Sequence, residues 1–182
     1  EVPSEIGAGT RGASLGIDAI KIAALDFMSN FFVHFPSEKI PTENKLLFEP
    51  IESPYAKRVK GVISMYDKVS KAVADSMKNN FFPVILSGDH SNAGATIAGI
   101  KIAKPKSRLG VIWIDAHADI NTRESSLTHS FHGMPLSFLI GVDPLYDNQE
   151  WFQERLKPEN LIYFGLRDLD LAEKQILEKY RI

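Results

Sequence analysis

The sequence predicts an α/β protein with a central parallel sheet and helices packed against both of its faces. Apolar stretches of strand length alternate with stretches of helical periodicity along the 182 residues. The strand-like stretches are apolar at consecutive positions, which is typical of parallel strands that are buried on both faces. A chain of this length can bury the core of one such domain.

The first half of the chain contains two predicted helices and the connection between them. Residues 17–32 have apolar side chains at helical spacing and directly follow Gly16. Residues 36–54 contain several prolines and have little periodicity, so we expect a connection there. Residues 56–80 form the longest predicted helix. Its apolar positions recur at every third or fourth residue: Val59, Val62, Ile63, Tyr66, Val69, Val73 and Met77.

The second half alternates strands with helices. Strands are predicted at the apolar runs 83–86, 108–116 and 160–168. Helices are predicted at 93–103, 134–140 and 172–180, and a polar connection is predicted at 143–158. This order favours strand–helix–strand units and therefore a single parallel sheet.

Composition excludes several classes of protein. The formal net charge of −2 gives no broad attraction to nucleic acid or to an anionic membrane. Cysteine is absent, which excludes disulfides and thiolate metal sites and is compatible with a reducing compartment. No apolar run approaches the roughly 18 residues that a membrane span needs. We therefore predict a cytoplasmic protein that binds neither nucleic acid nor membrane.

We predict a single domain, residues 1–182. Both ends of the sequence suggest that this domain is part of a longer natural chain. It begins with Glu1 instead of Met, in a loop rich in glycine and serine, and it stops directly after a predicted helix. A parallel sheet seldom closes on such an ending, so we expect truncation at both ends.

Three side chains that can bind metal follow the second predicted strand. In "VIWIDAHADINT", Asp115, His117 and Asp119 alternate with alanines. If this segment stays extended, the three side chains point the same way. Carboxylates and imidazole suit a divalent cation such as Mn²⁺, and the carboxyl end of a parallel strand is a usual place for ligands. The alternative is a solvated loop whose aspartates cap a helix.

Two further histidines have settings that suggest chemistry. His90 and Asp89 lie just past the first strand in "VILSGDHS", so His90 is predicted to join the metal ligands, although a structural histidine is the alternative. Asp89 is predicted either to orient a metal ligand by a hydrogen bond, without binding the metal itself, or to cap a loop. His132, in "HSFHGMP", lies on a tight loop, where an imidazole can move protons near neutral pH. His129 and His34 have no comparable setting.

Four motifs in order, "SGDHS", "DAHADINT", "HGMPLSFLIG" and "FGLRDLDLAE", resemble those of the ureohydrolases, the family of arginase, agmatinase and formiminoglutamase. The last two look most like arginase. The resemblance implies a three-layer α/β/α fold and a pair of Mn²⁺ ions at the carboxyl edge of the sheet. It also implies hydrolysis of L-arginine to ornithine and urea, in a homo-oligomer that is a trimer or a hexamer.

The resemblance also implies roles for individual residues. His90, Asp115 and Asp119 match the ligands of one manganese ion, and Asp115 and His117 match those of the other, so that Asp115 bridges them. His132 matches the histidine that transfers protons.

Five other residues match substrate contacts of the family. Asn121, Thr128 and Ser130 fall in the region that holds the α-carboxylate of the amino acid. Asp170 and Glu173 fall where the α-amino group is held. Thr128 stands where serine is usual and Ser130 where asparagine is common, so the carboxylate contacts are expected to differ.

Other departures leave alternatives open. Ser87 replaces the first glycine of the usual G-G-D-H. The later S-x-D-x-D motif and a downstream glutamate of the family are absent, so these residues contain about half of a metal site. The alternatives are another ureohydrolase, of the formiminoglutamase or agmatinase type, and a truncated non-catalytic fragment.

Overall fold

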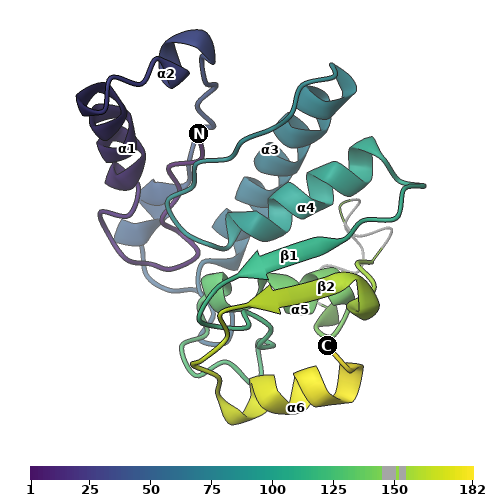
Figure 1. Cartoon of the computed structure of the whole chain (residues 1–182). Helices are drawn as coiled ribbons and strands as arrows, with labels where there is room; N and C mark the ends of the chain where they lie inside the picture. Colours follow the sequence, from purple (N-terminus) through teal and green to yellow (C-terminus); the bar gives the residue numbers. More distant parts are fainter. Residues whose placement is uncertain (145–150, 152–154) are drawn as a thin grey trace.

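The computed structural model describes residues 1–144, 151 and 155–182. Within them lie six α-helices and two strands (Figure 1). The helices are α1 (Leu15–Asp26), α2 (Phe31–His34), α3 (Val59–Lys78), α4 (Asn92–Ala103), α5 (Pro135–Ile140) and α6 (Leu171–Tyr180), and the strands are β1 (Val111–Ile114) and β2 (Leu161–Phe164). Short 3₁₀ turns are η1 (Asn44–Phe48), η2 (Phe131–Gly133) and η5 (Pro158–Asn160).

The two strands are parallel, as predicted. Val111 pairs with Leu161, and the register continues to Ile114 and Phe164, so both strands end at the same edge of the sheet. In Figure 1 the two arrows point the same way. The segments that follow Ile114 and Phe164 therefore begin side by side, which brings the predicted metal ligands next to the "RDLDLAE" motif.

One face of the strands faces the core. Trp113 and Leu161 are each only 5% exposed and belong to the cluster of buried side chains contributed mainly by α3, α4 and α5. On the other face Ile112 and Ile114 are 64% and 80% exposed. β1 is thus apolar on both faces, but among the described residues only one of these faces is buried.

The strand predicted at residues 83–86 is wrong for the described part of the chain. These residues form no ladder, and among the described residues the only pairing at this segment is a parallel bridge between Val2 and Ser87, directly after it. The backbone N–H of Val2 donates to the carbonyl of Leu86 (2.7 Å), and Val84 is 60% exposed. The physical reason is that the described residues provide this segment with one short neighbour, which is too little for a ladder.

The predicted helices form, with shifted ends. The segment 17–32 is two helices, α1 and α2, because Met28 adopts a left-handed conformation (φ 53°) and interrupts the helix. The long amphipathic helix is α3, which begins after Arg58. It packs against α4, and its predicted apolar stripe is largely buried.

Two other predictions concern longer segments. Within the described residues no helix is both long enough and apolar enough to cross a membrane. Of the connection predicted at 143–158, residues 145–150 and 152–154 lie outside the described part of the chain. The described end of this connection, η5, leads directly into β2.

Candidate active site

Three of the predicted ligands converge at the carboxyl edge of the sheet. The Nδ1 atom of His90 lies 2.7 Å from Oδ2 of Asp119 and 3.1 Å from Oδ2 of Asp115. One nitrogen or oxygen atom from each of the three residues lies within 4.8 Å of the others. An imidazole nitrogen and two carboxylate oxygens at this separation form a donor set that a divalent cation can bind.

The backbone does not bring them together in the predicted way. The chain leaves the strand at Ile114 and turns, with the N–H of His117 donating to Oδ1 of Asp115 (2.9 Å), and Asp119 has a left-handed φ of 50°. The expectation that Asp115, His117 and Asp119 share one face of an extended segment is therefore wrong. The turn, instead of strand alternation, directs the carboxylates of Asp115 and Asp119 to His90.

Neighbouring elements hold this turn. The hydroxyl of Tyr163, on β2, donates to the carbonyl of Ala118 (2.7 Å), and the N–H of Leu136, on α5, donates to the carbonyl of Asp119 (3.0 Å). Both Ala118 and Asp119 are buried. The position of Asp119 thus depends on contacts with residues distant in the sequence.

His117 lies on the outer side of Asp115. Its Nδ1 is 3.4 Å from Oδ1 of Asp115, and its Nε2 is 3.4 Å from Oδ2 of Asp168. His90 contacts the other oxygen, Oδ2, so Asp115 presents one carboxylate oxygen to His90 and the other to His117. This arrangement is compatible with a bridging carboxylate.

The environment of His90 favours its charged form when no cation is bound. Burial lowers the pKa of His90, but the hydrogen bond to Asp119 and the charges of Asp119 and Asp115 outweigh burial, so that its pKa is raised. The ring also packs against Trp113, with ring centroids 4.6 Å apart. A cation bound here has to displace the proton on His90, so its binding is expected to weaken at acid pH.

Asp89 caps a loop. Its Oδ1 accepts hydrogen bonds from the N–H (2.9 Å) and hydroxyl (2.5 Å) of Ser91, and its Oδ2 accepts from the N–H of Gly7 (3.1 Å). Burial raises the pKa of Asp89, against the effect of these bonds. A Cβ on Gly7 would lie 2.2 Å from Oγ of Ser91, so only glycine fits this approach.

The same glycine contacts His132. The carbonyl of Gly7 accepts a hydrogen bond from the backbone N–H of His132 (3.3 Å) and lies 3.4 Å from its Nδ1. A carbonyl oxygen can only accept, so this contact favours the tautomer with the proton on Nδ1 and a free lone pair on Nε2. His132 is partly exposed, on η2.

Asn121 and the start of α6 form a second polar cluster beside the ligands. The amide of Asn121 donates to Oδ2 of Asp170 (2.7 Å), and the hydroxyl of Ser125 donates to Oδ1 of Asn121 (2.6 Å). Asp170 and Glu173 also cap α6 reciprocally: the N–H of Glu173 donates to Asp170 (2.8 Å), and the N–H of Asp170 donates to Glu173 (3.2 Å). Both residues thus have a structural role in addition to any role in binding.

Thr128 and Ser130 lie on the loop that leads to η2. The N–H of Ser130 donates to Oγ1 of Thr128 (3.3 Å), and the hydroxyl of Ser130 donates to the carbonyl of Thr128 (3.4 Å). Thr128 is exposed, and Ser130 is 8% exposed. Within the described part of the chain no hydrogen bond joins this pair to Asn121 or to Asp170.

Glu173 supports a prediction about stability. Burial raises its pKa, hydrogen bonds from the N–H groups of Asp170 and Ile120 oppose the rise, and the charges of Asp170 and Asp119 add to it. A raised carboxyl pKa adds stability below the unfolded value of 4.5, and this contribution is lost as pH rises through the folded value. Glu173→Gln keeps the capping hydrogen bonds but cannot titrate, so we expect its melting temperature to fall less than that of the wild type between pH 4.5 and neutral pH.

Thermal unfolding of the two proteins across this pH range measures the difference. Glu178→Gln, at an exposed position of the same helix, is the matched control and should follow the wild type. A Glu173→Gln variant with the full pH dependence of the wild type would show that other groups cause it.

Sequence reasoning missed two residues at this site. The backbone of Gly7 contacts both Asp89 and His132, and the carboxylate of Asp168 lies near His117. The glycine-rich opening loop was a signal for a close backbone approach, but nothing in the sequence identified its partners. Asp168 lies two residues before Asp170, within the "FGLRDLDLAE" motif.

Known proteins resemble this chain over its whole length. A family model described as "Arginase family" matches residues 1–182. The arginase of Staphylococcus aureus (strain COL) is 36% identical over 184 residues, which cover 99% of this chain and 60% of that protein. The arginase of Bacillus caldovelox is 33% identical, with 98% and 60% covered. The chain thus spans about 60% of the length of these relatives.

Solved structures agree with this result. The structure of Bacillus caldovelox arginase superposes with a TM-score of 0.84 at 33% identity and covers 100% of this chain and 61% of that one. That of Entamoeba histolytica arginase in complex with L-ornithine gives a TM-score of 0.79 at 27% identity, with 100% and 60% covered. The three-layer α/β/α fold class expected from the sequence is therefore confirmed. With its motifs in order along a matching fold, the chain belongs to the arginase family.

Proposed function

We propose that the full natural protein containing this chain hydrolyses L-arginine to ornithine and urea. The observation that carries the proposal is the convergence of His90, Asp115 and Asp119, in a chain of the arginase family, beside the polar cluster of Asn121 and Asp170. The related Entamoeba histolytica arginase was solved in complex with L-ornithine, the product of this reaction.

The donor set at the sheet edge fits Mn²⁺. His90, Asp115 and Asp119 would hold one ion, and His117 would hold a second through the shared carboxylate of Asp115, in agreement with the contacts of its two oxygens. When bound, such ions lower the pKa of a coordinated water so that it is a nucleophile near neutral pH. Oxygen and nitrogen ligands without thiolate are the type that manganese accepts.

The polar cluster would hold the amino-acid end of the substrate. The carboxylates of Asp170 and Glu173 carry the charge that attracts an α-ammonium group, while Asn121, Thr128 and Ser130 offer donors for the α-carboxylate. Agmatine has no α-carboxylate, so these contacts favour an amino acid over agmatine as the substrate.

His132 would move protons. In the reaction, water oxygen forms a bond to the guanidinium carbon, and the bond from that carbon to the side-chain nitrogen breaks, which yields urea. The nitrogen that leaves as the ornithine amine takes up a proton. The Nε2 atom of His132, left as the basic nitrogen by the contact of Nδ1 with Gly7, can gain a proton from the water and give it to this amine.

Urea release from L-arginine and from agmatine, together with formamide release from formiminoglutamate, tests the proposal. We expect the purified full protein, loaded with Mn²⁺, to act on L-arginine much faster than on agmatine or formiminoglutamate. A preference for either of the latter would make the protein a different ureohydrolase. Absence of activity toward all of them, with the fold intact, would favour a non-catalytic protein.

Asp170→Asn is expected to weaken substrate binding without unfolding the site. Asparagine is also a good N-cap, so α6 keeps its start, but the negative charge opposite the α-ammonium group is lost. Loss of one charge-assisted hydrogen bond corresponds to roughly 10- to 100-fold in kcat/KM, mostly through KM. Asp18→Asn, in the exposed first turn of α1, is the control. Equal KM values for Asp170→Asn and the wild type would contradict the assigned contact.

Two further properties are part of the proposal. We infer a homo-oligomer, a trimer or a hexamer by analogy with the family, in the cytoplasm. Light scattering of the full protein measures the first, and fractionation of the source cells measures the second.

A further inference from the structure

A chain of hydrogen bonds connects Asp89, the neighbour of the candidate ligand His90, with His132. The N–H of Gly7 donates to Oδ2 of Asp89 (3.1 Å). The carbonyl of Gly7 accepts from the backbone N–H of His132 (3.3 Å) and lies 3.4 Å from its Nδ1. Gly7, which is 82 residues from Asp89 and 125 from His132, therefore contacts the loop of the metal ligands on one side and the proton-transfer histidine on the other.

The carboxylate of Asp89 is held in one orientation. It is only 6% exposed, and its Oδ1 accepts from the N–H (2.9 Å) and the hydroxyl (2.5 Å) of Ser91. The backbone N–H of Asp89 donates to the carbonyl of Ser4 (2.9 Å), so this loop runs beside the beginning of the chain. Among the described residues Oδ2 accepts its hydrogen bond from Gly7.

The backbone of Gly7 depends on this hydrogen bond for its direction. A glycine has no side chain to restrict its backbone, so its conformation is fixed only by its contacts. A larger residue does not fit, because a Cβ on Gly7 would lie 2.2 Å from Oγ of Ser91 and 2.4 Å from Oδ1 of Asp89. The bond from the N–H of Gly7 to Asp89 thus helps to direct the carbonyl of Gly7 at His132.

The direction of this carbonyl matters for proton transfer. When the proton on Nδ1 of His132 faces it, Nε2 keeps the lone pair that the proposed reaction uses. His132 is partly exposed on η2, so without this contact its ring is free to present either nitrogen. A displacement of about 1 Å at a reacting group can cost roughly 10²-fold in rate.

We propose that Asp89 is a positioning residue that acts on His132 through the backbone of Gly7. The inference rests on the proposed function, in which His132 transfers protons. Asp89 is not a member of the group His90, Asp115 and Asp119 that could hold a metal ion, so its effect on the rate can be separated from metal binding. This role is additional to the capping of its own loop.

Asp89→Asn tests the inference in the full protein loaded with Mn²⁺. An amide has one acceptor oxygen, and two donors of Ser91 face Oδ1, so we expect the amide NH₂ to face the N–H of Gly7 and to break that contact. The kcat for urea release should fall about tenfold, with the KM for L-arginine and the manganese content unchanged. In a His132→Ala background the same substitution should lower kcat no further, because its effect passes through His132.

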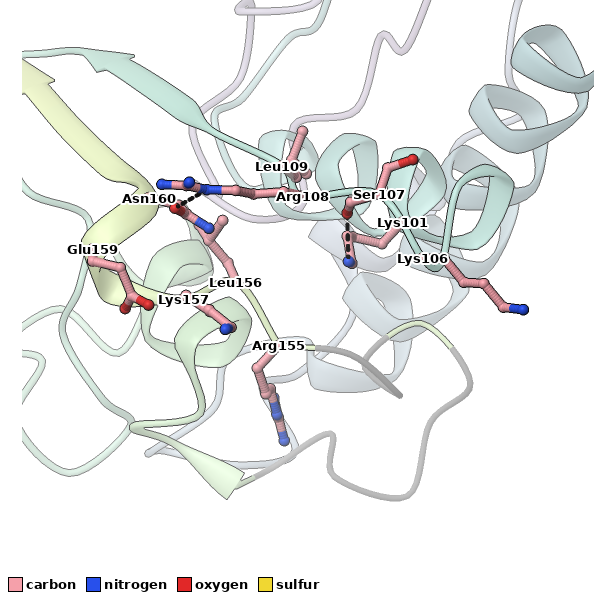
Figure 2. A pocket seen from close by; sticks show the side chains of 10 residues that line it. All are labelled: Lys101, Lys106, Ser107, Arg108, Leu109, Arg155, Leu156, Lys157, Glu159 and Asn160. Carbon is pink, nitrogen blue, oxygen red and sulfur yellow. Dashed lines mark hydrogen bonds between the residues drawn. The ribbon is translucent and has the colours of Figure 1, made fainter.

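Two more variants complete the design. Gly7→Ala breaks the same contact from the other side, since its Cβ would clash with Ser91 and Asp89, and it replaces Asp89→Asn if that variant does not fold. Asn160→Ala is the control for loss of a hydrogen bond between distant segments. It removes the acceptor of the bond from Nε of Arg108 (3.0 Å) at the opposite, amino ends of β1 and β2 (Figure 2), and it should keep the kcat of the wild type.

A crystal structure of Asp89→Asn, or of Gly7→Ala in its place, separates this inference from the proposed function. We expect the carbonyl of Gly7 to lie out of contact with Nδ1 of His132, whether or not the protein releases urea. Absence of urea release by the wild type contradicts the proposed function alone. The inference is overturned if His132 keeps this contact, if the variant of an active wild type keeps its kcat or loses manganese, or if kcat falls equally with and without His132.

Discussion

Replacing Asp115 by alanine is expected to abolish urea release by the full natural protein and to remove most of its bound manganese. The carboxylate of Asp115 contacts His90 through one oxygen and His117 through the other, so it is the only side chain of the described cluster that reaches both histidines. Replacing a residue that only hydrogen-bonds a metal ligand typically costs 10- to 100-fold in metal affinity or activity. Loss of the shared carboxylate should cost more.

The measurements are manganese per chain and urea production, made on the same preparation. Glu124→Ala, an exposed carboxylate on the loop that follows the ligands, is the control and should retain both metal and activity. Because Asp115 also accepts a hydrogen bond from the N–H of His117, circular dichroism and melting temperature must accompany the assay. A folded Asp115→Ala protein with its full manganese content would refute the proposed ligand set.

Replacing His132 by alanine is expected to lower turnover by roughly 10²-fold and to leave the manganese content unchanged. Proton transfer by a positioned side chain is typically worth 10²–10⁴-fold. His132 is partly exposed on η2, so water and buffer can take over part of its role, and we expect the low end of this range. His132 is not in the cluster formed by His90, Asp115 and Asp119, which is why its loss should spare the metal.

A proton-transfer role also predicts chemical rescue. Added imidazole should restore part of the rate of the His132→Ala variant. His34→Ala, which removes an exposed imidazole on α2, should keep the rate of the wild type and should not respond to imidazole. Loss of manganese from the His132 variant would make this residue a ligand and would require a new assignment of roles.

Much of the fold could be predicted because it depends on local patterns. The spacing of apolar residues in α3 and the consecutive apolar residues in β1 and β2 specify a helix and two parallel strands without reference to distant parts of the chain. The helix ends were less accurate, as at Met28, since a single left-handed residue leaves the apolar pattern unchanged. The strand expected at 83–86 failed because pairing needs neighbours, which the segment itself cannot provide.

The candidate site, too, depends partly on the local sequence and partly on contacts between distant residues. The sequence determined which side chains are available, because Asp115 and His90 each follow an apolar run and the ends of such runs meet at one edge of a parallel sheet. It also determined the family, through the order of four motifs. Those inferences depend on residue type and order alone.

Only the tertiary structure decided how these side chains are oriented. An extended segment would have placed Asp115, His117 and Asp119 on one face, but the chain turns after Ile114 and Asp119 adopts a positive φ. That conformation is disfavoured for an aspartate in isolation and is held by Tyr163 and Leu136, which donate to the carbonyls of this turn from β2 and α5. The same holds for the contact of His132 with Gly7, which are 125 residues apart. Contacts between residues so distant in the chain leave no periodic pattern in the sequence, and their energies depend on the complete fold.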